Sequence, residues 1–358
     1  MGKGETLRIA MVGCGRIADV ECLGYLDHPR AEIYATCDVR REVAERRAQQ
    51  WGATKAYTDF RQVLDDPAVD AVEILTPHDL HAEQAIAALE AGKHVSLQKP
   101  PARTMEEFDR IAAAAERSDR VFRVLENYMY YPPHVRAKEL IEEGAIGMPL
   151  SVRLKTAAGR PDTGWPVDPS SWEWRLDPER CGGGQVTFDH GYHCFHMARY
   201  FMDADIERVH AFIDFMGEGG FDATALISWT YGGQPKRMGS WEVIPSIGLK
   251  VRSKYYAGEE RTEIHGTDGI IWINRCTGKL LEEPAVVLYR EGETRAFHHL
   301  PADWGESFRL AGRDFVDAVL EGRRPPLQLD VARRVLASSI AAQVSAREHR
   351  EVAVSEIA

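Results

Sequence analysis

The stretch "LRIAMVGCGRIAD", residues 7–19, decides the fold. An apolar run that predicts a strand leads directly into Gly13, Gly15 and Ala18, which match the GxGxxG/A pattern of a dinucleotide-binding loop. In that pattern the first glycine permits a tight turn, and the second lets the backbone approach a pyrophosphate. The small third residue lets the next helix pack closely, with its free N–H groups toward the phosphates.

Residues 1–127 alternate short apolar runs with amphipathic segments, which is typical of a parallel sheet with helices on both faces. The runs that predict strands lie at residues 7–13, 32–38, 71–77, 94–100 and 121–127. Two helix patterns between them, 41–52 and 79–92, end at a glycine. We therefore predict an α/β fold class, with an N-terminal Rossmann dinucleotide-binding domain over residues 1–127.

Residues 128–358 have a different pattern, in which several runs alternate apolar and polar residues with period two. The strand candidates lie at residues 149–159, 206–217, 223–233, 237–244, 248–258 and 261–275. Helix patterns cover 134–144, about 305–321 and about 329–346. This predicts a second, α+β domain built on a large, mostly antiparallel open sheet.

The composition of the 358 residues limits the partners. A formal net charge of -11 does not favour nucleic acid. No apolar run approaches the ~18 residues that span a bilayer, and the start passes into a strand pattern without a signal peptide. Six scattered cysteines predict free thiols, so we expect a cytoplasmic protein.

Asp38 ends the second predicted strand, where a carboxylate can accept a hydrogen bond from a ribose hydroxyl. Its charge favours NAD, because it would repel a 2′-phosphate. Arg40 and Arg41 follow at once and could hold that phosphate, so NADP stays open; they could also simply begin a solvated helix.

Two further strand ends carry polar residues at the sheet edge where such folds bind ligands. In "TPHDLH", Pro77 forces a turn and His81 lies near a helix start, where a capping or surface role is the alternative. In "LQKPPAR", the two prolines force the chain to turn directly after Lys99.

A second cluster lies in "CGGGQVTFDHGYHCFH", residues 181–196. Asp189 and His193 are four residues apart and share a helix face. A histidine can take a proton from an alcohol at neutral pH, and a neighbouring carboxylate can orient it. The alternatives are a buried Asp–His pair, or a zinc site that also uses His190 and His196, although the HExxH signature is absent.

In combination, "VGCGRIA", "TPHDLH", "QKP", "GGGQVTFDHGYH" and "EIHGTDGIIWIN" resemble the Gfo/Idh/MocA oxidoreductases over nearly the whole chain. The resemblance implies NAD(H) or NADP(H) as cofactor and a sugar, cyclitol or similar polyol as substrate. It also implies that the open sheet of the second domain serves as an interface between copies of the chain, so we expect a homo-oligomer, a dimer or a tetramer.

The family's Glu-Lys-Pro motif matches Lys99 and Pro100, with Gln98 in place of the glutamate. The resemblance implies that Lys99 stabilises the developing alkoxide and that the peptide bond before Pro100 is cis. It implies His193 as the general base and Asp189 as its orienting partner. His196 stands where the family often has an aspartate.

The expected contacts fall into two groups. Residues expected at the cofactor are Gly13, Gly15, Arg16, Ile17, Asp38, Arg40, Thr76, Pro77, His81, Gln98, Lys99, Asn127, Trp174 and Arg175. Residues expected at the substrate are Lys99, Tyr128, Trp165, Arg175, Asp189 and His193, with Trp172 as a neighbour that could equally be core.

These features predict an NAD(P)-dependent dehydrogenase or ketoreductase that transfers a hydride between the nicotinamide and a secondary alcohol of a sugar, glycoside or cyclitol. One alternative is a hydrolase or lyase that keeps NAD bound and recycles it through transient sugar oxidation. Two weaker alternatives are a redox sensor that only binds dinucleotide and a zinc hydrolase; we expect no metal.

Overall fold

The computed structural model describes residues 6–161, 163–165, 173–217 and 222–357. Contacts along the chain divide it into two compact units. The first comprises Met1–Asn127, Pro169–Gly182 and Phe308–Arg333, and the second comprises Tyr128–Asp168, Gly183–Ser307 and Arg334–Ala358. None of the helices among the described residues has the length and apolar character needed to cross a membrane.

The described residues of the first unit form a six-stranded parallel sheet in the order β3-β2-β1-β4-β5-β6, which is the Rossmann strand order. Its strands are β1 (Leu7–Val12), β2 (Ala31–Cys37), β3 (Lys55–Tyr57), β4 (Ala71–Ile74), β5 (His94–Gln98) and β6 (Phe122–Leu125). The predicted fold class is confirmed. Strand β3 was not foreseen, because its three residues carry no apolar run.

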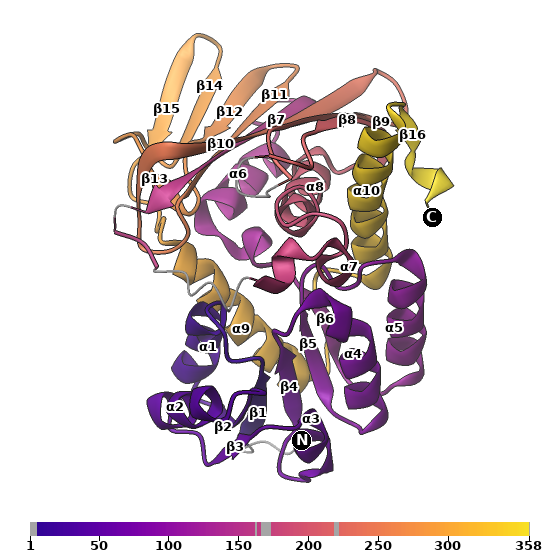
Figure 1. Ribbon diagram of the computed structural model, residues 1–358. Coiled ribbons are helices and arrows are strands. Elements are labelled where there is room, and N and C mark those ends of the chain that lie inside the picture. The colour runs from indigo at the N-terminus through magenta and orange to yellow at the C-terminus, as the bar shows by residue number, and fades with distance from the viewer. Residues whose placement is uncertain (1–5, 162, 166–172, 218–221, 358) are drawn as a thin grey trace. The chain divides into compact units, whose positions relative to one another are not determined.

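Helices cover both faces of this sheet (Figure 1). They are α1 (Ala18–Asp27), α2 (Arg41–Trp51), α3 (Phe60–Asp65), α4 (His81–Glu90), α5 (Met105–Arg117) and the part of α9 (Trp304–Glu321) from Phe308 onward. The unit also contains the short helix α7 (Pro178–Cys181), which contacts the 3-10 turns η1 (His78–Leu80) and η4 (Glu173–Leu176). Helices α1 and α9 cross closely, since a Cβ on Gly24 would lie 2.6 Å from the Cα of Gly312. Phe315 of α9 thereby joins Tyr25 of α1 in the core beside β1.

The described residues of the second unit form a ten-stranded sheet in the order β15-β14-β12-β11-β7-β10-β9-β8-β16, with β13 paired to β10. The strands are β7 (Pro149–Pro161), β8 (Ile206–Ile213), β9 (Ala225–Tyr231), β10 (Arg237–Ser253), β11 (Gly258–Gly266), β12 (Gly269–Ile273), β13 (Gly278–Lys279), β14 (Val286–Arg290), β15 (Glu293–Phe297) and β16 (Val352–Ala353). The β7–β10 pair is parallel and its neighbours are antiparallel, as expected for a mostly antiparallel sheet.

Two strand predictions for this sheet need correction. The candidates 237–244 and 248–258 are largely one strand, β10, with a register shift between Pro245 and Lys250. The candidate 261–275 is instead a hairpin, in which β11 and β12 are joined at Thr267 and Asp268. The sequence did not predict β14 or β15, whose outer residues are mostly polar.

Helices lie under one face of the second sheet (Figure 1). They are α6 (Pro132–Glu142), α8 (Asp189–Met202) and the part of α10 (Leu329–Glu348) from Arg334 onward, with 3-10 turns η2 (Asn127–Tyr130) and η6 (Val354–Glu356). A Cβ on Gly191 would lie 3.2 Å from the ring of Trp241, whose Nε1 donates to Oγ1 of Thr156 at 3.0 Å. The first turns of α8 are therefore packed directly against β10 and β7.

Candidate functional site

The loop after β1 has the geometry of a phosphate-binding turn. Gly13 has φ +87°, and a Cβ there would lie 2.8 Å from the carbonyl carbon of Leu75, so only glycine fits. A Cβ on Gly15 would meet nothing within 4 Å, so the backbone there borders open space. Ile17 is the N-cap residue of α1 and makes no side-chain capping hydrogen bond, and its neighbour Arg16 pairs with Asp19 at 3.2 Å.

Asp38 ties the end of β2 to this loop. Its Oδ2 accepts from the backbone N–H of Cys14 at 3.0 Å, and its Oδ1 accepts from the N–H of Arg40 at 3.0 Å. The guanidinium of Arg40 lies 3.6 Å from the same carboxylate. Each oxygen keeps a lone pair that a ribose hydroxyl can use. The open backbone at Gly15 and this carboxylate together fit a dinucleotide.

Arg47 of α2 was not predicted as a site residue, yet it stabilises the glycine loop through hydrogen bonds to the loop's main chain. Its side chain donates to the carbonyl oxygens of Cys14 and Gly15, both at 3.4 Å, and forms an ion pair with Asp19. It is a buried residue on the apolar stripe that includes Trp51. A charged residue on a buried helical stripe is the sequence signal that could have revealed it.

His81 links two of the predicted strand-end loops. Its Nε2 lies 2.9 Å from the carbonyl oxygen of Thr76, and its Nδ1 lies 2.9 Å from the carbonyl oxygen of Pro100. Both partners are acceptors, so both hydrogen bonds form only when the ring carries a hydrogen on each nitrogen. The side chain is fully buried, so His81 supports these loops from within and is not a surface residue. Thr76, which precedes Pro77, also donates to Gln84 at 2.6 Å.

Gln98 is the last residue of β5 and Lys99 follows it directly, so Lys99 lies at the carboxyl end of the strand as predicted. The Lys99–Pro100 peptide bond is cis, which confirms the expectation. The side-chain amide of Gln98 accepts from the backbone N–H of Lys99 at 2.9 Å and donates to Glu21 of α1 at 2.6 Å. Gln98 is buried, whereas Lys99 is half-buried.

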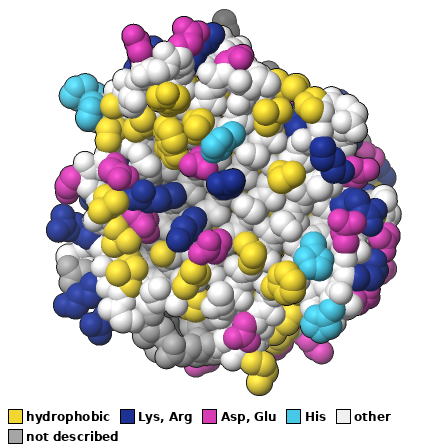
Figure 2. Space-filling view, turned by 90° about the horizontal axis from the view of Figure 1, so that it is seen from above, with side chains coloured by type: hydrophobic (Ala, Val, Ile, Leu, Met, Phe, Trp, Pro, Cys, Tyr) yellow, Lys and Arg dark blue, Asp and Glu magenta, His cyan; other side chains and the backbone are white. Residues whose placement is uncertain are grey.

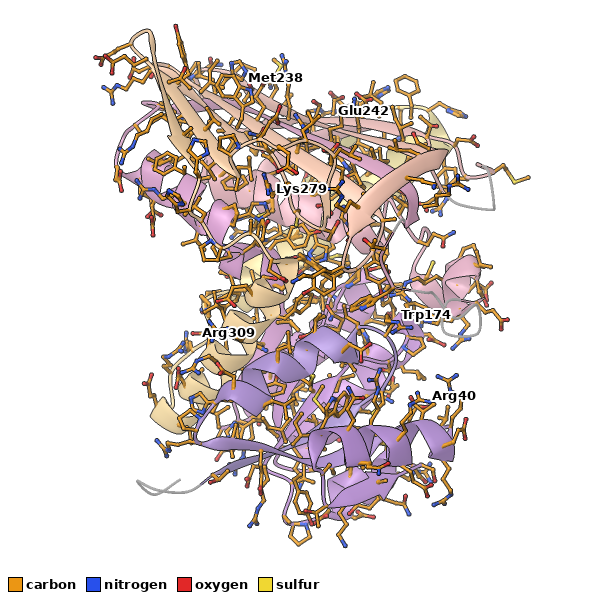
Figure 3. All side chains as sticks on the ribbon, turned by 90° about the vertical axis from the view of Figure 1, so that its left-hand side faces the viewer. Arg40, Trp174, Met238, Glu242, Lys279 and Arg309 are labelled. Carbon is orange, nitrogen blue, oxygen red and sulfur yellow. The ribbon has the colours of Figure 1, made fainter. Side chains whose placement is uncertain are left out.

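Trp174 and Arg175 belong to the first unit, on η4. The guanidinium carbon of Arg175 lies 4.2 Å from the ring centroid of Trp174, and the ring of His78 meets that indole edge-on at 4.7 Å. Figure 3 shows Trp174 and Arg40 on the same side of the molecule. Trp172 lies outside the described residues.

His193 of the second unit is held on α8 beside an aromatic ring. The ring of Tyr128 stacks on the imidazole of His193, with centroids 4.0 Å apart and planes 9° apart. Asp189 is the first residue of the same helix, and both Asp189 and His193 are buried. Asn127, which precedes Tyr128, is also buried but belongs to the first unit.

Glu260 of β11 is a second residue that the sequence analysis missed. Both of its oxygens lie 2.9 Å from the hydroxyl of Tyr128, and one lies 3.7 Å from Nε2 of His190. Burial raises the pKa of Tyr128 well above its ordinary value, so the hydroxyl keeps its proton and donates to Glu260. Glu260, Thr262 and Ile264 are spaced two residues apart on β11, so Glu260 lies on the same face of the sheet as these two buried residues. This spacing is the signal in the sequence that could have identified Glu260.

Trp165 and His196 each lie beside other aromatic rings of the second unit. Trp165 packs edge-on against Tyr255 and Tyr256, each at 5.2 Å between centroids. His196 stacks on Tyr200 at 6.1 Å. Among the described residues, no three His, Cys, Asp or Glu side chains are arranged to hold a metal ion.

Two family profiles match the chain. The profile described as "Oxidoreductase family, NAD-binding Rossmann fold" matches residues 7–126, and the one described as "GFO/IDH/MocA C-terminal domain" matches residues 134–272. Together they cover the glycine loop, Asp38, Lys99 and the helix that carries His193. The cofactor is therefore NAD, in agreement with the geometry of the loop.

Named relatives agree with these profiles. The chain is 27% identical to myo-inositol 2-dehydrogenase of Thermotoga maritima, over 98% of this chain and 99% of that protein. It is 32% identical to levoglucosan dehydrogenase of Pseudarthrobacter phenanthrenivorans, over 75% and 74%. A solved levoglucosan dehydrogenase in complex with NADH and levoglucosan superposes with a TM-score of 0.80 at 26% identity, covering 98% of this chain and 99% of that one. These relatives do not favour the hydrolase or lyase alternative.

Proposed function

The chain belongs to the Gfo/Idh/MocA family of NAD-binding oxidoreductases, and on that premise we propose which of its residues act on the substrate. It is an NAD-dependent oxidoreductase acting on CH–OH groups. The cofactor supplies the hydride acceptor or donor. The chain's own side chains hold the substrate and move the proton of its hydroxyl group.

We propose that His193 takes this proton and that Lys99 stabilises the oxygen as it becomes negative. The single observation that carries the proposal is the ring of Tyr128 stacked on the imidazole of His193 at 4.0 Å, with Asp189 at the start of the same helix. A base held in this way keeps one orientation. Arg175, Trp165 and Tyr128 are proposed to contact the substrate.

The other predicted contacts stay proposals for the cofactor. We propose that residues 1–127 bind NAD and that residues 128–358 bind the substrate. The proposed cofactor contacts are Gly13, Gly15, Arg16, Ile17, Asp38, Arg40, Thr76, Pro77, His81, Gln98, Lys99, Asn127, Trp174 and Arg175. His81 would act through its loops, because its two ring nitrogens already face backbone carbonyls.

The substrate is proposed to be a secondary alcohol of a sugar, glycoside or cyclitol. This rests on relatives named for myo-inositol, levoglucosan and scyllo-inositol. Such substrates offer several hydroxyl groups, which suit the carboxylate, imidazole and guanidinium groups assigned above.

Absorbance at 340 nm tests the proposal, with NAD or NADP and a panel of inositols, monosaccharides and glycosides. We expect reduction of NAD with one substrate class. Lys99→Ala and His193→Asn should each lower kcat by about 10²–10³-fold without unfolding the protein. The control is Lys55→Ala, which removes an exposed lysine of β3 and should keep wild-type kcat.

Full activity in Lys99→Ala would contradict the assigned roles. Substrate turnover without net formation of NADH would instead identify an enzyme that recycles its cofactor.

We also propose that the protein is a homo-oligomer that uses the outer face of its second sheet. Phe212, Leu226 and Met238 are at least half exposed there. Figure 2 shows hydrophobic groups between charged side chains on this face, and Figure 3 shows Met238 and Glu242 on β10. Exposed apolar groups on a sheet face are typical of a contact surface.

A cytoplasmic location is proposed because all six cysteines are free thiols.

A further inference from the structure

Glu21 is a carboxyl group buried inside the first unit, on the helix that follows the glycine loop. Only 2% of the residue is exposed. Its Oε1 accepts from Nε2 of Gln98 at 2.6 Å, and Oε1 of Gln98 accepts from the backbone N–H of Lys99 at 2.9 Å. One side-chain amide therefore joins Glu21 to the main chain of Lys99.

A glutamine amide can turn over by 180° with little change in shape, so its surroundings decide which end faces each partner. The NH₂ end of Gln98 faces Glu21, which is the orientation that an ionised carboxylate requires because it only accepts hydrogen bonds. The carbonyl end must then face the N–H of Lys99. We propose that Glu21 is a positioning residue for Lys99, acting through Gln98; this rests on the function proposed for Lys99.

The charged groups that act on Glu21 are Glu73, Arg123 and Lys99. Glu73 of β4 accepts from the hydroxyl of Tyr25, and the guanidinium of Arg123 of β6 lies 3.9 Å from Glu73. Burial and then the charge of Glu73 raise the pKa of Glu21 well above its ordinary value, against the effects of Arg123, Gln98 and Lys99. A protonated Glu21 can donate, so acidification removes its selection of one amide orientation.

The departure from the family's Glu-Lys-Pro motif becomes understandable from this contact. A glutamate at position 98 would place a second acceptor-only group against Glu21, and two buried carboxylates in contact repel each other. With Gln98, the carboxylate lies on α1 and the amide lies on β5. The reverse arrangement, Glu21→Gln with Gln98→Glu, would keep one carboxylate, one amide and both hydrogen bonds.

The decisive experiment compares Glu21→Gln, Gln98→Glu and the double variant in the NAD-dependent assay. Glu21→Gln keeps the shape of the side chain but no longer selects one orientation of the Gln98 amide. We therefore expect kcat to fall about tenfold while KM for NAD stays within about twofold. Gln98→Glu should lower kcat by a similar or larger factor. The double variant should return kcat to within about threefold of the wild type.

Hydrogen–deuterium exchange at the Lys99 amide gives a second readout that needs no cofactor. The amide should exchange faster in Glu21→Gln and return to the wild-type rate in the double variant. Glu73→Gln is the control, because it removes a buried carboxyl from the same cluster but not the one that Gln98 contacts. It should leave the exchange of Lys99 unchanged at pH 8.

Wild-type kcat and wild-type exchange in Glu21→Gln would overturn the proposal, and so would a double variant that is no better than either single one. If Glu21→Gln does not fold, the test is whether the double variant has a higher kcat and a slower Lys99 exchange than Gln98→Glu. A fully active Lys99→Ala would refute the role of Lys99, whereas the exchange rates would still report on Glu21.

Discussion

Gly13 and Gly15 stand two residues apart in one loop, yet the structure requires them for different reasons. The backbone of Leu75 and Thr76 occupies the space that a side chain on Gly13 would need, and Gly13 has φ +87°. Nothing occupies that space at Gly15. Gly13 is therefore needed for the fold, and Gly15 is needed by the ligand that approaches it.

A matched pair of alanine variants tests this difference. Gly13→Ala should lower the free energy of unfolding by about 2–4 kcal/mol, because it adds both a steric clash and backbone strain. Gly15→Ala should keep stability within about 1 kcal/mol but weaken NAD binding about tenfold or more, because its methyl group enters the open space. Urea denaturation and calorimetric titration with NAD measure the two effects. Equal losses of stability in both variants would contradict the assignment.

Some site residues could be found from the sequence because they stand next to a recognisable motif. Asp38 and Lys99 each directly follow the last residue of a strand, and the glycines also follow one. Arg47, Glu21 and Glu260 could not be assigned a role, because their partners lie 33, 77 and 132 residues away in the chain. Only folding brings such pairs together, so the sequence shows at most a charged residue within an otherwise apolar pattern.

At the scale of elements, the pairing of β5 with β6 begins at a histidine that must be neutral. Nδ1 of His94 accepts from the backbone N–H of Val121 at 2.9 Å. Burial, assisted by the charge of Arg120, lowers the pKa of His94 to about 4. The unfolded chain takes up this proton near pH ~6.5. The stability that His94 contributes is thus fully present above that pH and is lost as the pH falls toward 4.

We expect the melting temperature to fall between pH ~6.5 and pH 4, with His94 contributing up to ~2 kcal/mol after allowance for its partial exposure. His94→Asn keeps an acceptor for Val121 but cannot be protonated there, so its profile should be flatter. Thermal melts across this range measure the effect. The same slope in His94→Asn and wild type would contradict it, and exposed His299→Asn serves as control.

Helices and strands were predictable where the hydrophobic periodicity of the sequence was strong. They were less predictable where pairing with a neighbouring strand determines the structure. Pro245 and Gly248 suggest a break, yet β10 continues because β7 pairs with it on both sides of the register shift. Strand β3 has three residues and exists through its pairing with β2. Sheet neighbours far away in sequence can override local propensity, and the sequence alone does not display them.

At the scale of the whole molecule, the outer face of the second sheet should decide the assembly state. Phe212 and Leu226 stand directly opposite each other on β8 and β9, at 63% and 50% exposure. Phe212→Glu combined with Leu226→Lys should shift the protein to a smaller species, because it places charges inside the proposed contact. Light scattering after size exclusion measures this.

The control for that experiment is Leu26→Lys on α1, where the leucine is 51% exposed. It should leave the assembly state of the wild type unchanged. An unchanged mass in the sheet variant would exclude this face as the contact.

The interleaving of the two units has a consequence for biosynthesis. The core around Leu7 and Ile9 is completed by Phe315, Val316 and Val319 of α9. At ~5–20 residues per second, the ribosome needs roughly 10–40 s to synthesise the chain between Asn127 and the part of α9 that begins at Phe308. Part of the apolar surface of the nascent first unit therefore stays exposed until α9 has been synthesised. We expect chaperones to bind this surface during that interval.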